Sequence, residues 1–525
     1  MNLTHAQRCV FGLTCAGYSE RWAVEKHILT TKAKGFRMHN SIKSKNQSSY
    51  LYLLLGFAAL FFSNGKWILP VATYLSPIFL MRFLRYRKPV NGFLYLIIAG
   101  LTSNIFIWKG MIPTPGMFYY ILMLMMSIFT SLTYLIDRIY YKRIPGIVST
   151  LVFPSVFVLM EFITISTNPS GSFGMLGHTQ SSLPLLQMLS VTGIYGITFI
   201  VMWTASVINW LWDHGFKNHN LRKTLWVYAV PVLVITLYGQ IRVGRQTNDD
   251  TVRIASISIP EDELIQIYEG QPDSINSQLE KSFLNSCHIA AMSGAKIVFG
   301  TESIINVQSD MENSFLEQAQ ELAIRDGIYL GLPMLVFPSD ASQSLPINKI
   351  TWISPEGELL LEYCKSKPTP GEGSYGDGII RYFDSPYGRI GSAICFDMNF
   401  PSLIHQAGSM QIDIMAVPGN DWREISPYHT YAASFRAIEQ GFSMVRAASW
   451  GLSASFNGRG EKLSSLDYFT SDQSILYSDV PTKGQVTVYS IVGDLFAWIA
   501  VLFVLAISMY VIITWKAQKN IKPNH

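Results

Sequence analysis

Charged residues are scarce in this chain of 525 amino acids. Asp, Glu, Lys and Arg together make up 14% of the sequence, whereas soluble proteins contain about 25%. Hydrophobic residues reach 49%. The net charge of +4 is too small to indicate a nucleic-acid partner, and we expect none. The composition therefore excludes an ordinary soluble protein and favours a membrane protein.

Cysteine is also rare. The five cysteines form no CxxC pair and show no zinc spacing, so we expect neither a disulfide framework nor a metal site. No P-loop motif is present, and a bound nucleotide is therefore not indicated. We expect a protein that works without cofactors.

Long apolar runs, by contrast, are abundant. A membrane-spanning helix needs about 20 mostly apolar residues. Eight runs approach this length: 49–64, 67–84, 91–108, 117–136, 145–165, 185–211, 225–241 and 492–515. Glu161 lies inside the fifth run, where a carboxylate is costly and marks a functional site by default. Hydration near the helix end, or a bond to a neighbouring helix, is the alternative explanation.

Lys and Arg are distributed unevenly among the loops. They cluster after the second, fourth, sixth and eighth runs and are sparse in the alternate loops. Short loops rich in Lys and Arg stay in the cytoplasm. The pattern predicts that both termini are cytoplasmic and that residues 246–490 lie outside. The first 48 residues, with eight Lys or Arg and two Glu, do not resemble a cleavable signal peptide.

Strand-like and helix-like runs alternate between residues 252 and 490. This alternation is typical of a layered α/β domain. Glu356-Gly357-Glu358 separates two strand-like runs and predicts a hairpin, so we expect mixed rather than purely parallel sheets. No internal repeat of fixed period is present.

Three residues at the ends of strand-like runs supply the groups needed for acyl transfer. They are Glu302, Lys365 and Cys395. A thiol nucleophile must lose its proton as it attacks, a carboxylate can take that proton, and an ammonium can stabilise the developing oxyanion. Ligands gather beyond the carboxyl ends of strands in α/β sheets. The sequence therefore places a candidate acyl-transfer site there.

Other groups compete for these roles. A cysteine–histidine pair could use His288, His405 or His429, although none matches a cysteine-protease signature. Cys395 could also be a buried structural thiol. Cys287, in a helix-like run, and Cys364, beside Lys365, are interpreted as packing residues.

The sequences around the three candidates resemble the carbon–nitrogen hydrolase (nitrilase) superfamily. The resemblance rests on an ordered set of motifs: GTESI at 300–304, EYCK at 362–365 with PGEG at 370–373, AICFDMNFP at 393–401, GNDW at 419–422 and RAIE at 436–439. It implies an α-β-β-α sandwich in which Glu302 is the general base, Lys365 stabilises the tetrahedral intermediate and Cys395 is the nucleophile. Glu372 corresponds to a second glutamate of the family.

Further residues of these motifs are candidates for lining the site or binding substrate. They are Phe396, Asp397, Asn420 and Trp422. Arg436 and Glu439, three residues apart, are interpreted as a helix ion pair. Gly300-Thr301 before the glutamate and Phe396-Asp397 after the cysteine depart from the usual family pattern.

The membrane half resembles the apolipoprotein N-acyltransferase family within that superfamily. The matching segments are FGMLGHTQ at 173–180, SVTGIYGITFIVMW at 190–203 and VGDLFAW at 492–498. Gln187 and Tyr195, on the sixth run, could line a lipid-facing cleft or simply pack between helices. The resemblance implies transfer of a fatty acyl group from a membrane phospholipid, through a Cys395 thioester, to the N-terminal amine of a diacylglyceryl-cysteine lipoprotein. It also implies a multi-pass protein of the cell membrane, and we expect a monomer.

These observations divide the chain into five parts. They are a basic N-terminal extension (1–48), a seven-span membrane domain (49–245), a nitrilase-like catalytic domain (246–490), a C-terminal transmembrane helix (491–515) and a cytoplasmic tail (516–525). A membrane-anchored amidase or nitrilase acting on an extracytoplasmic amide is the main alternative. A catalytically inactive lipid-binding scaffold is the other.

Overall fold

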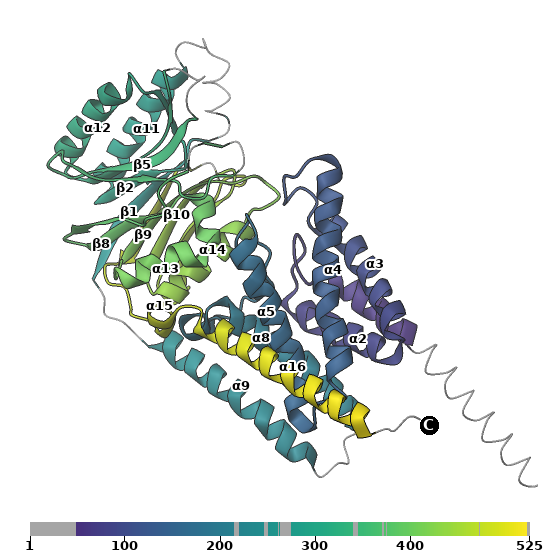
Figure 1. The fold of residues 1–525 in the computed structure, drawn as a ribbon. Coiled ribbons are helices and arrows are strands. Elements are labelled where there is room, and N and C mark those ends of the chain that lie inside the picture. Colours follow the sequence, from purple (N-terminus) through teal and green to yellow (C-terminus); the bar gives the residue numbers. More distant parts are fainter. Residues whose placement is uncertain are drawn as a thin grey trace, which may run out of the picture.

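A computed structural model describes residues 49–214, 220–245, 250–260, 262, 275–339, 345–369, 372–373, 375–471 and 473–521. The expected N-terminal extension, with Cys9 and Cys15, lies outside the described residues. Figure 1 shows an α/β domain seated on one end of a bundle of long helices. The C-terminal helix returns from the α/β domain along that bundle.

Six helices of the described residues are long and apolar enough to cross a membrane. They are α3 (Pro89–Ile107), α4 (Gly116–Tyr140), η1 with α5 (Gly146–Leu151 and Val152–Thr167), α8 (Ile194–His214), α9 (Asn220–Gly244) and α16 (Leu495–Ile521). The first two expected spans are shorter helices, Ser49–Leu60 and α2 (Pro70–Tyr86). The bundle thus contains helices at all eight expected positions, of which six meet the length needed for a span.

The sixth expected span, 185–211, is not one helix. Two single-turn helices, α6 (Leu183–Leu186) and α7 (Leu189–Thr192), precede α8. Gly193 lies between α7 and α8 and interrupts the helical conformation. Its φ is 60°, a backbone conformation that favours glycine. A Cβ atom at Gly193 would lie 2.4 Å from the Tyr489 ring, so this turn is also a site of close packing. The span itself is present as α8, but its expected start at residue 185 was wrong, because an apolar run alone cannot reveal a break in a helix.

The α/β domain contains two mixed sheets. The first has seven strands, in the order β13-β1-β2-β4-β5-β6 with β3 paired to β4. Its strands are β1 (Thr251–Ile257), β2 (Ile297–Gly300), β3 (Ile305–Gln308), β4 (Tyr329–Phe337), β5 (Ile347–Ile353), β6 (Leu359–Cys364) and β13 (Ile475–Pro481). Strands β5 and β6 are antiparallel and Gly357 between them has φ 86°, which confirms the predicted hairpin.

The second sheet has six strands in the order β12-β11-β10-β9-β8-β7. They are β7 (Tyr382–Ser385), β8 (Gly388–Ser392), β9 (Ile414–Asn420), β10 (Ser443–Ser449), β11 (Leu452–Phe456) and β12 (Lys462–Asp467). Strands β8, β9 and β10 run parallel and the outer pairs are antiparallel. The expectation of mixed sheets is confirmed.

Helices cover the outer faces of both sheets (Figure 1). Helices α11 (Ile275–Met292) and α12 (Glu312–Asp326) pack on the first sheet, and α13 (Pro401–Ser409) and α14 (Tyr428–Gln440) pack on the second. The two sheets share a buried core that includes Trp352 and Met415. Trp352 Nε1 donates a hydrogen bond of 2.8 Å to Ser392 Oγ across that core. The observed order of layers is the expected α-β-β-α sandwich.

The α/β domain is joined to the bundle by polar contacts as well as by the chain. Ile194 N, at the start of α8, donates to Glu439 Oε1 of α14 at 3.1 Å. Gln187 Nε2 donates to Arg459 O at 2.9 Å. Short α15 (Val488–Val492) leads from the sandwich into α16. These buried bonds hold the second sheet and α14 at a defined position over the helices.

Candidate functional site

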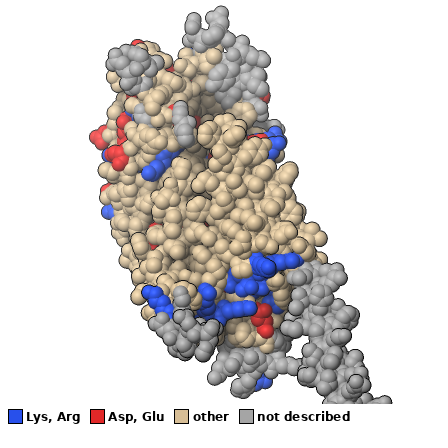
Figure 2. Space-filling model, turned by 45° about the vertical axis from the view of Figure 1, so that its right-hand side comes forward, with Lys and Arg blue, Asp and Glu red and all other residues tan. Residues whose placement is uncertain are grey.

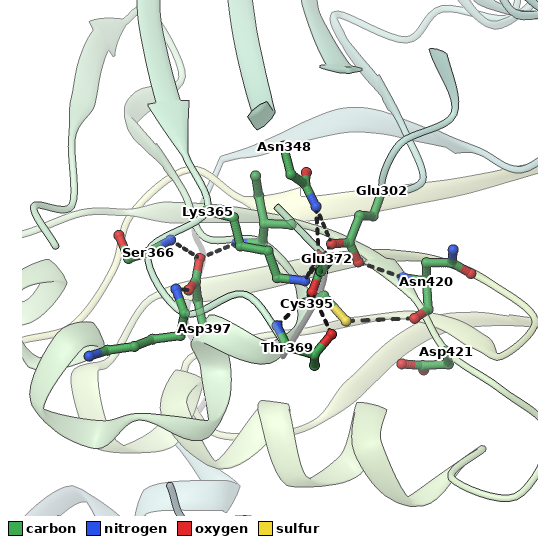
Figure 3. Close-up of polar contacts among 12 residues, drawn as sticks. Glu302, Asn348, Lys365, Ser366, Thr369, Glu372, Cys395, Asp397, Asn420 and Asp421 are labelled. Atoms are coloured by element: carbon green, nitrogen blue, oxygen red, sulfur yellow. Dashed lines mark hydrogen bonds and ion pairs between the residues drawn. The ribbon is translucent and has the colours of Figure 1, made fainter. Parts of the chain in front are cut away.

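Three strands from two sheets bring Glu302, Lys365 and Cys395 together. Glu302 follows β2 and Lys365 follows β6, both in the first sheet. Cys395 begins the 3₁₀ helix η4 (Cys395–Asn399), just after β8 of the second sheet. Lys365 Nζ lies 2.7 Å from Glu302 Oε1, and Figure 3 shows the Cys395 sulfur beside this pair. The predicted convergence is therefore observed, and all three residues are buried.

The Glu302 carboxylate is held on both oxygens. Oε1 accepts hydrogen bonds from Lys365 Nζ and from Asn348 Nδ2, each at 2.7 Å. Oε2 accepts from the backbone N–H of Asn420 at 2.9 Å. Burial raises the pKa of Glu302, and the adjacent Lys365 limits this rise. A carboxylate with this pKa shift is better able to accept a proton than an exposed one.

Glu372 binds the other side of Lys365. Its Oε1 contacts Lys365 Nζ and accepts from Asn348 Nδ2 at 2.8 Å. Its Oε2 accepts from Thr369 N at 2.7 Å and from Thr369 Oγ1 at 2.8 Å. Burial alone would raise the pKa of Glu372, but Lys365 and Thr369 outweigh burial and lower it. Lys365 is thus shared by two carboxylates, which outweigh its own burial and raise its pKa.

Cys395 has backbone φ 46°, the left-handed region that a non-glycine residue occupies mostly at functional or strained sites. Its Sγ lies 3.8 Å from Asn420 O and 3.8 Å from Arg446 Nη2. Burial and the carboxylate of Glu302 raise the pKa of the thiol, whereas Lys365 and Arg446 lower it. The resting thiol is therefore protonated, and it needs both a base and nearby cations to react.

Asp397 acts on the loops rather than on the sulfur. Its Oδ2 accepts from Tyr363 Oη at 2.8 Å and from Ile394 N at 3.0 Å. Its Oδ1 accepts from Lys367 N at 2.7 Å. Asp397 thus ties the loop that carries Lys365 to the turn that carries Cys395 (Figure 3).

Two other expected site residues lie at the edge of this group. Trp422 Nε1 donates to Gly110 O, between α3 and α4, at 2.7 Å. Trp422 therefore joins the α/β domain to the bundle. The Phe396 ring is half-buried and packs against Phe400 at 5.8 Å between centroids.

Four residues of the site were not singled out by the sequence as partners of Cys395. Asn348, near the start of β5, has no motif to mark it. Asp421, His429 and Arg446 form a buried cluster next to Cys395. His429 was considered only as the partner of a Cys–His pair, but its Nδ1 bonds to Asp421 Oδ1 at 2.7 Å, and burial lowers its pKa.

Ligand-type atoms of Cys395, Asp421 and His429 lie within 4.8 Å of one another. Such a set could hold a metal ion in principle. Arg446 Nη2, however, lies among them, 2.8 Å from Asp421 Oδ1 and 3.1 Å from His429 Nδ1. Because the guanidinium already supplies a positive charge there, these residues do not fit a second cation.

The remaining candidates have other surroundings. His288 pairs with Asp326 at 2.9 Å, and His405 packs against Tyr489. Cys287 is fully buried in α11 and Cys364 is half-buried at the end of β6. Arg436 and Glu439 form the expected ion pair at 2.8 Å.

The residues singled out in the membrane half are buried. Gln187 and Tyr195 have no exposed surface, which favours packing. Glu161 accepts from Leu176 N at 2.9 Å and lines a pocket of about 410 Å³ among α2, α3, α4 and α5. The bond to Leu176 explains how this buried carboxylate is accommodated inside the bundle.

Comparison with known families gives matches over both halves of the chain. Residues 45–207 match the apolipoprotein N-acyltransferase N-terminal domain, and residues 270–484 match the carbon-nitrogen hydrolase family. The chain belongs to the apolipoprotein N-acyltransferase family. It is accordingly an integral membrane protein with a nitrilase-like α/β domain.

Relatives named apolipoprotein N-acyltransferase cover most of the chain. The Geobacter metallireducens protein is 24% identical over 389 residues, which is 68% of this chain and 73% of the relative. Apolipoprotein N-acyltransferase 1 of Treponema denticola is 21% identical over 506 residues, covering 85% and 92%. Among solved structures, an amidase from Nesterenkonia is 18% identical with TM-score 0.36, covering 46% of this chain and 94% of the amidase.

Proposed function

We propose that this protein transfers a fatty acyl group from a membrane phospholipid to the N-terminal amine of a diacylglyceryl-cysteine lipoprotein. The observation that carries the proposal is the buried group of Glu302, Lys365 and Cys395 at the strand ends of a domain seated on apolar helices. This group supplies a base, a cation and a nucleophile. Membership of the apolipoprotein N-acyltransferase family supports the choice of substrates.

In the first half-reaction, Glu302 takes the proton of Cys395 and the sulfur attacks the ester carbonyl carbon of the phospholipid. Lys365 and the backbone N–H of Phe396 stabilise the negative oxygen of the tetrahedral intermediate. When the C–O bond breaks, Glu302 returns its proton to the leaving lysophospholipid alcohol. The fatty acyl group remains on Cys395 as a thioester.

In the second half-reaction, the α-amine of the lipoprotein attacks the thioester carbonyl. Glu302 takes a proton from the attacking nitrogen, the C–S bond breaks, and the proton passes to the Cys395 sulfur. The products are an N-acylated lipoprotein and free enzyme. Every proton moves between groups already present, so no cofactor is required.

The pocket in the bundle supports a lipid donor. It has about 410 Å³ of space, an apolar lining that includes Phe129 and Met175, and Glu161 at its wall. Gly174 lines the same pocket, and its N–H donates to Tyr428 Oη at 3.0 Å. Tyr428 directly precedes His429 in α14. An acyl chain in this pocket would thus lie next to the helix that faces Cys395.

We further propose that the catalytic domain is extracytoplasmic and both termini cytoplasmic, with the domain boundaries at 48, 245, 490 and 515. Lys and Arg side chains gather at the end of the bundle away from the α/β domain (Figure 2), and this distribution fits a cytoplasmic end. The site is complete within one chain, in line with a monomer.

Topology is tested with single cysteines at exposed positions Glu356, Lys142 and Lys516. A membrane-impermeant thiol reagent added to intact cells should label position 356 and leave positions 142 and 516 unlabelled until the membrane is opened. Labelling of 142 rather than 356 would reverse the orientation and exclude a lipoprotein acceptor outside the membrane.

The function is tested with purified enzyme in phospholipid–detergent micelles and a diacylglyceryl-cysteinyl peptide. Wild-type protein should convert the peptide to its N-acyl form, and mass spectrometry should detect a hydroxylamine-sensitive fatty-acyl adduct on Cys395. Cys395→Ala should lower the rate by roughly a thousandfold or more, since it removes the nucleophile. Cys364→Ala, the matched control, should retain activity. Release of fatty acid or ammonia with an unmodified peptide would instead favour the hydrolase alternative.

A further inference from the structure

A second cation, from the second sheet, lies against the Cys395 sulfur. Arg446, in the middle of β10, has no exposed side-chain surface. Its Nη2 lies 3.8 Å from Cys395 Sγ, 2.8 Å from Asp421 Oδ1 and 3.1 Å from His429 Nδ1. A sulfur acceptor at this distance from a guanidinium can be bonded when it is a thiolate.

Asp421 holds this guanidinium in place, and His429 supports Asp421. Asp421 Oδ1 accepts a hydrogen bond from Arg446 Nη2 and lies 2.7 Å from His429 Nδ1. Burial alone would raise the pKa of Asp421, but Arg446 and His429 outweigh burial and lower it. Asp421 is therefore a carboxylate that orients the arginine.

The backbone of β9 is shaped to fit the same group. A Cβ atom at Gly419 would lie 2.8 Å from Arg446 Nη2 and 2.9 Å from its Cζ. Glycine thus leaves the space in which the guanidinium packs between β9 and the sulfur. A Cβ atom at this position would require the Arg446 guanidinium to shift.

The guanidinium of Arg446 uses only part of its hydrogen-bonding capacity. Within the described part of the chain, its Nε and Nη1 have no hydrogen-bond partner. A buried guanidinium with free donors is costly, and an apolar side chain would fill this core position at lower cost. The arrangement is therefore better explained by a charge needed at the sulfur than by a need for stability.

The other charged groups near Cys395 are bound differently from Arg446, although Lys365 also lowers the pKa of the thiol and Glu302 and Asp421 raise it. Lys365 is shared between Glu302 and Glu372, so the first sheet contributes two carboxylates and one ammonium. Asp397, on the same turn as Cys395, is turned toward Tyr363 and the N–H of Lys367. His429 is neutral because burial lowers its pKa. Arg446 is thus the cation that is not already bonded by Glu302.

We propose that Arg446 is a further catalytic residue, which stabilises the Cys395 thiolate formed when Glu302 takes the proton, and that Asp421 and His429 position it. In this step the S–H bond breaks, the proton goes to Glu302 and the electron pair stays on a sulfur bonded by Arg446. The same contact stabilises the thiolate when it leaves at the end of the second half-reaction. The inference rests on the proposed function in that it takes Cys395 as the nucleophile.

The test measures the reactivity of the Cys395 thiol directly, without acyl transfer. Full-length protein in detergent micelles is alkylated with iodoacetamide at one pH near neutrality, and peptide mass spectrometry follows the rate at Cys395. In Arg446→Gln the rate should fall by about 10- to 1,000-fold, because losing an opposite charge at this distance raises the thiol pKa by about 1 to 3 and lowers the thiolate fraction accordingly. Arg446→Lys should recover part of the rate.

A further variant protects the test against misfolding. His429→Gln keeps the side-chain volume but removes the contact of Nδ1 with Asp421, so the arginine is less well held and the alkylation rate should fall by a smaller factor. The matched control is Arg436→Gln. This change removes another buried arginine of the same domain, which pairs with Glu439 and not with the cysteine, and should leave the alkylation rate at Cys395 unchanged.

The outcomes separate the inference from the proposed function. An unchanged alkylation rate in folded Arg446→Gln, or in His429→Gln if the first does not fold, overturns the inference even when the wild type acylates the peptide. An equal fall in Arg436→Gln also overturns it, because a general loss of charge or stability would then be the cause. A fall specific to Arg446 supports the inference even if no peptide acylation is found.

Discussion

Cys395 lies between two charged clusters that come from different sheets. On the side of the first sheet, Glu302 and Glu372 share the single ammonium of Lys365. On the side of the second sheet, Asp421 binds one guanidinium, Arg446, and one neutral imidazole, His429. The first cluster has two carboxylates for one ammonium, so it has an excess of negative charge and can accept a proton. In the second cluster Arg446 balances the charge of Asp421, so there is no excess negative charge and the guanidinium can stabilise a negative sulfur.

The difference indicates a division of labour across the interface of the two sheets. A base and an anion-stabilising cation on the same side would neutralise each other, as Lys365 and Glu302 partly do. Glu302 follows a strand of the first sheet and Arg446 lies in a strand of the second, so the group that takes the proton and the group that stabilises the negative sulfur come from different sheets. Variants on each side should therefore fail in different ways.

The largest effect is expected on the side of the first sheet. Glu302→Gln keeps the side-chain size and its acceptor oxygen but removes the base, and should slow acyl-enzyme formation by about 100- to 10,000-fold. Rapid mixing with phospholipid micelles and mass detection of the Cys395 adduct measures this rate. If the adduct forms at the wild-type rate, the base is elsewhere and the two clusters do not differ as described.

Lys365→Met should lower acyl transfer by about 100- to 1,000-fold, because it removes a cation that stabilises the oxyanion. It should also change the pH dependence of stability. Lys365 holds the pKa of Glu372 below its ordinary range, so this pair stabilises the folded state above the unfolded pKa of glutamate, about 4.3. That stability is lost as the pH falls through the lower, folded pKa.

Thermal unfolding at pH 7 and at pH 3.5 checks this second effect. Lys365→Met should have a lower melting temperature than the wild type at pH 7. The difference between the two melting temperatures should be smaller at pH 3.5. Lys349→Met serves as a comparison, since Lys349 pairs with Glu312 and Glu362 away from the sulfur. Equal losses at both pH values would mean that packing, and not the ion pair, explains the effect of Lys365.

The smallest effect is expected at Trp422, outside both clusters. Trp422→Phe removes one hydrogen bond to Gly110 O and should cost about 1 kcal/mol of unfolding free energy. Acyl transfer should fall less than tenfold, and the Cys395 alkylation rate should stay unchanged. A loss as large as that of Glu302→Gln would show that the contact with the bundle is part of the reaction.

Local sequence patterns were enough to predict several features of the fold and of the site. The apolar runs placed the long helices, the alternation of strands and helices placed the sandwich, and Glu302, Lys365 and Cys395 could be chosen because each follows a strand-like run within a recognisable motif. The apolar run at 185–211 predicted one continuous helix, and this prediction failed because Gly193 interrupts the helix. A glycine inside an apolar run does not reveal its own backbone conformation, which here depends on packing against Tyr489.

The sequence by itself determined which groups were available to the reaction, because the order of strands and the residues after them are local properties. Only the tertiary structure decided which charges meet at the sulfur. Asn348 and Arg446 lie within strands and carry no motif, and Asp421 reaches Arg446 only because β9 and β10 are neighbours in the second sheet. Electrostatic effects depend on distance in space, and pairing across sheets brings together residues that are far apart along the chain.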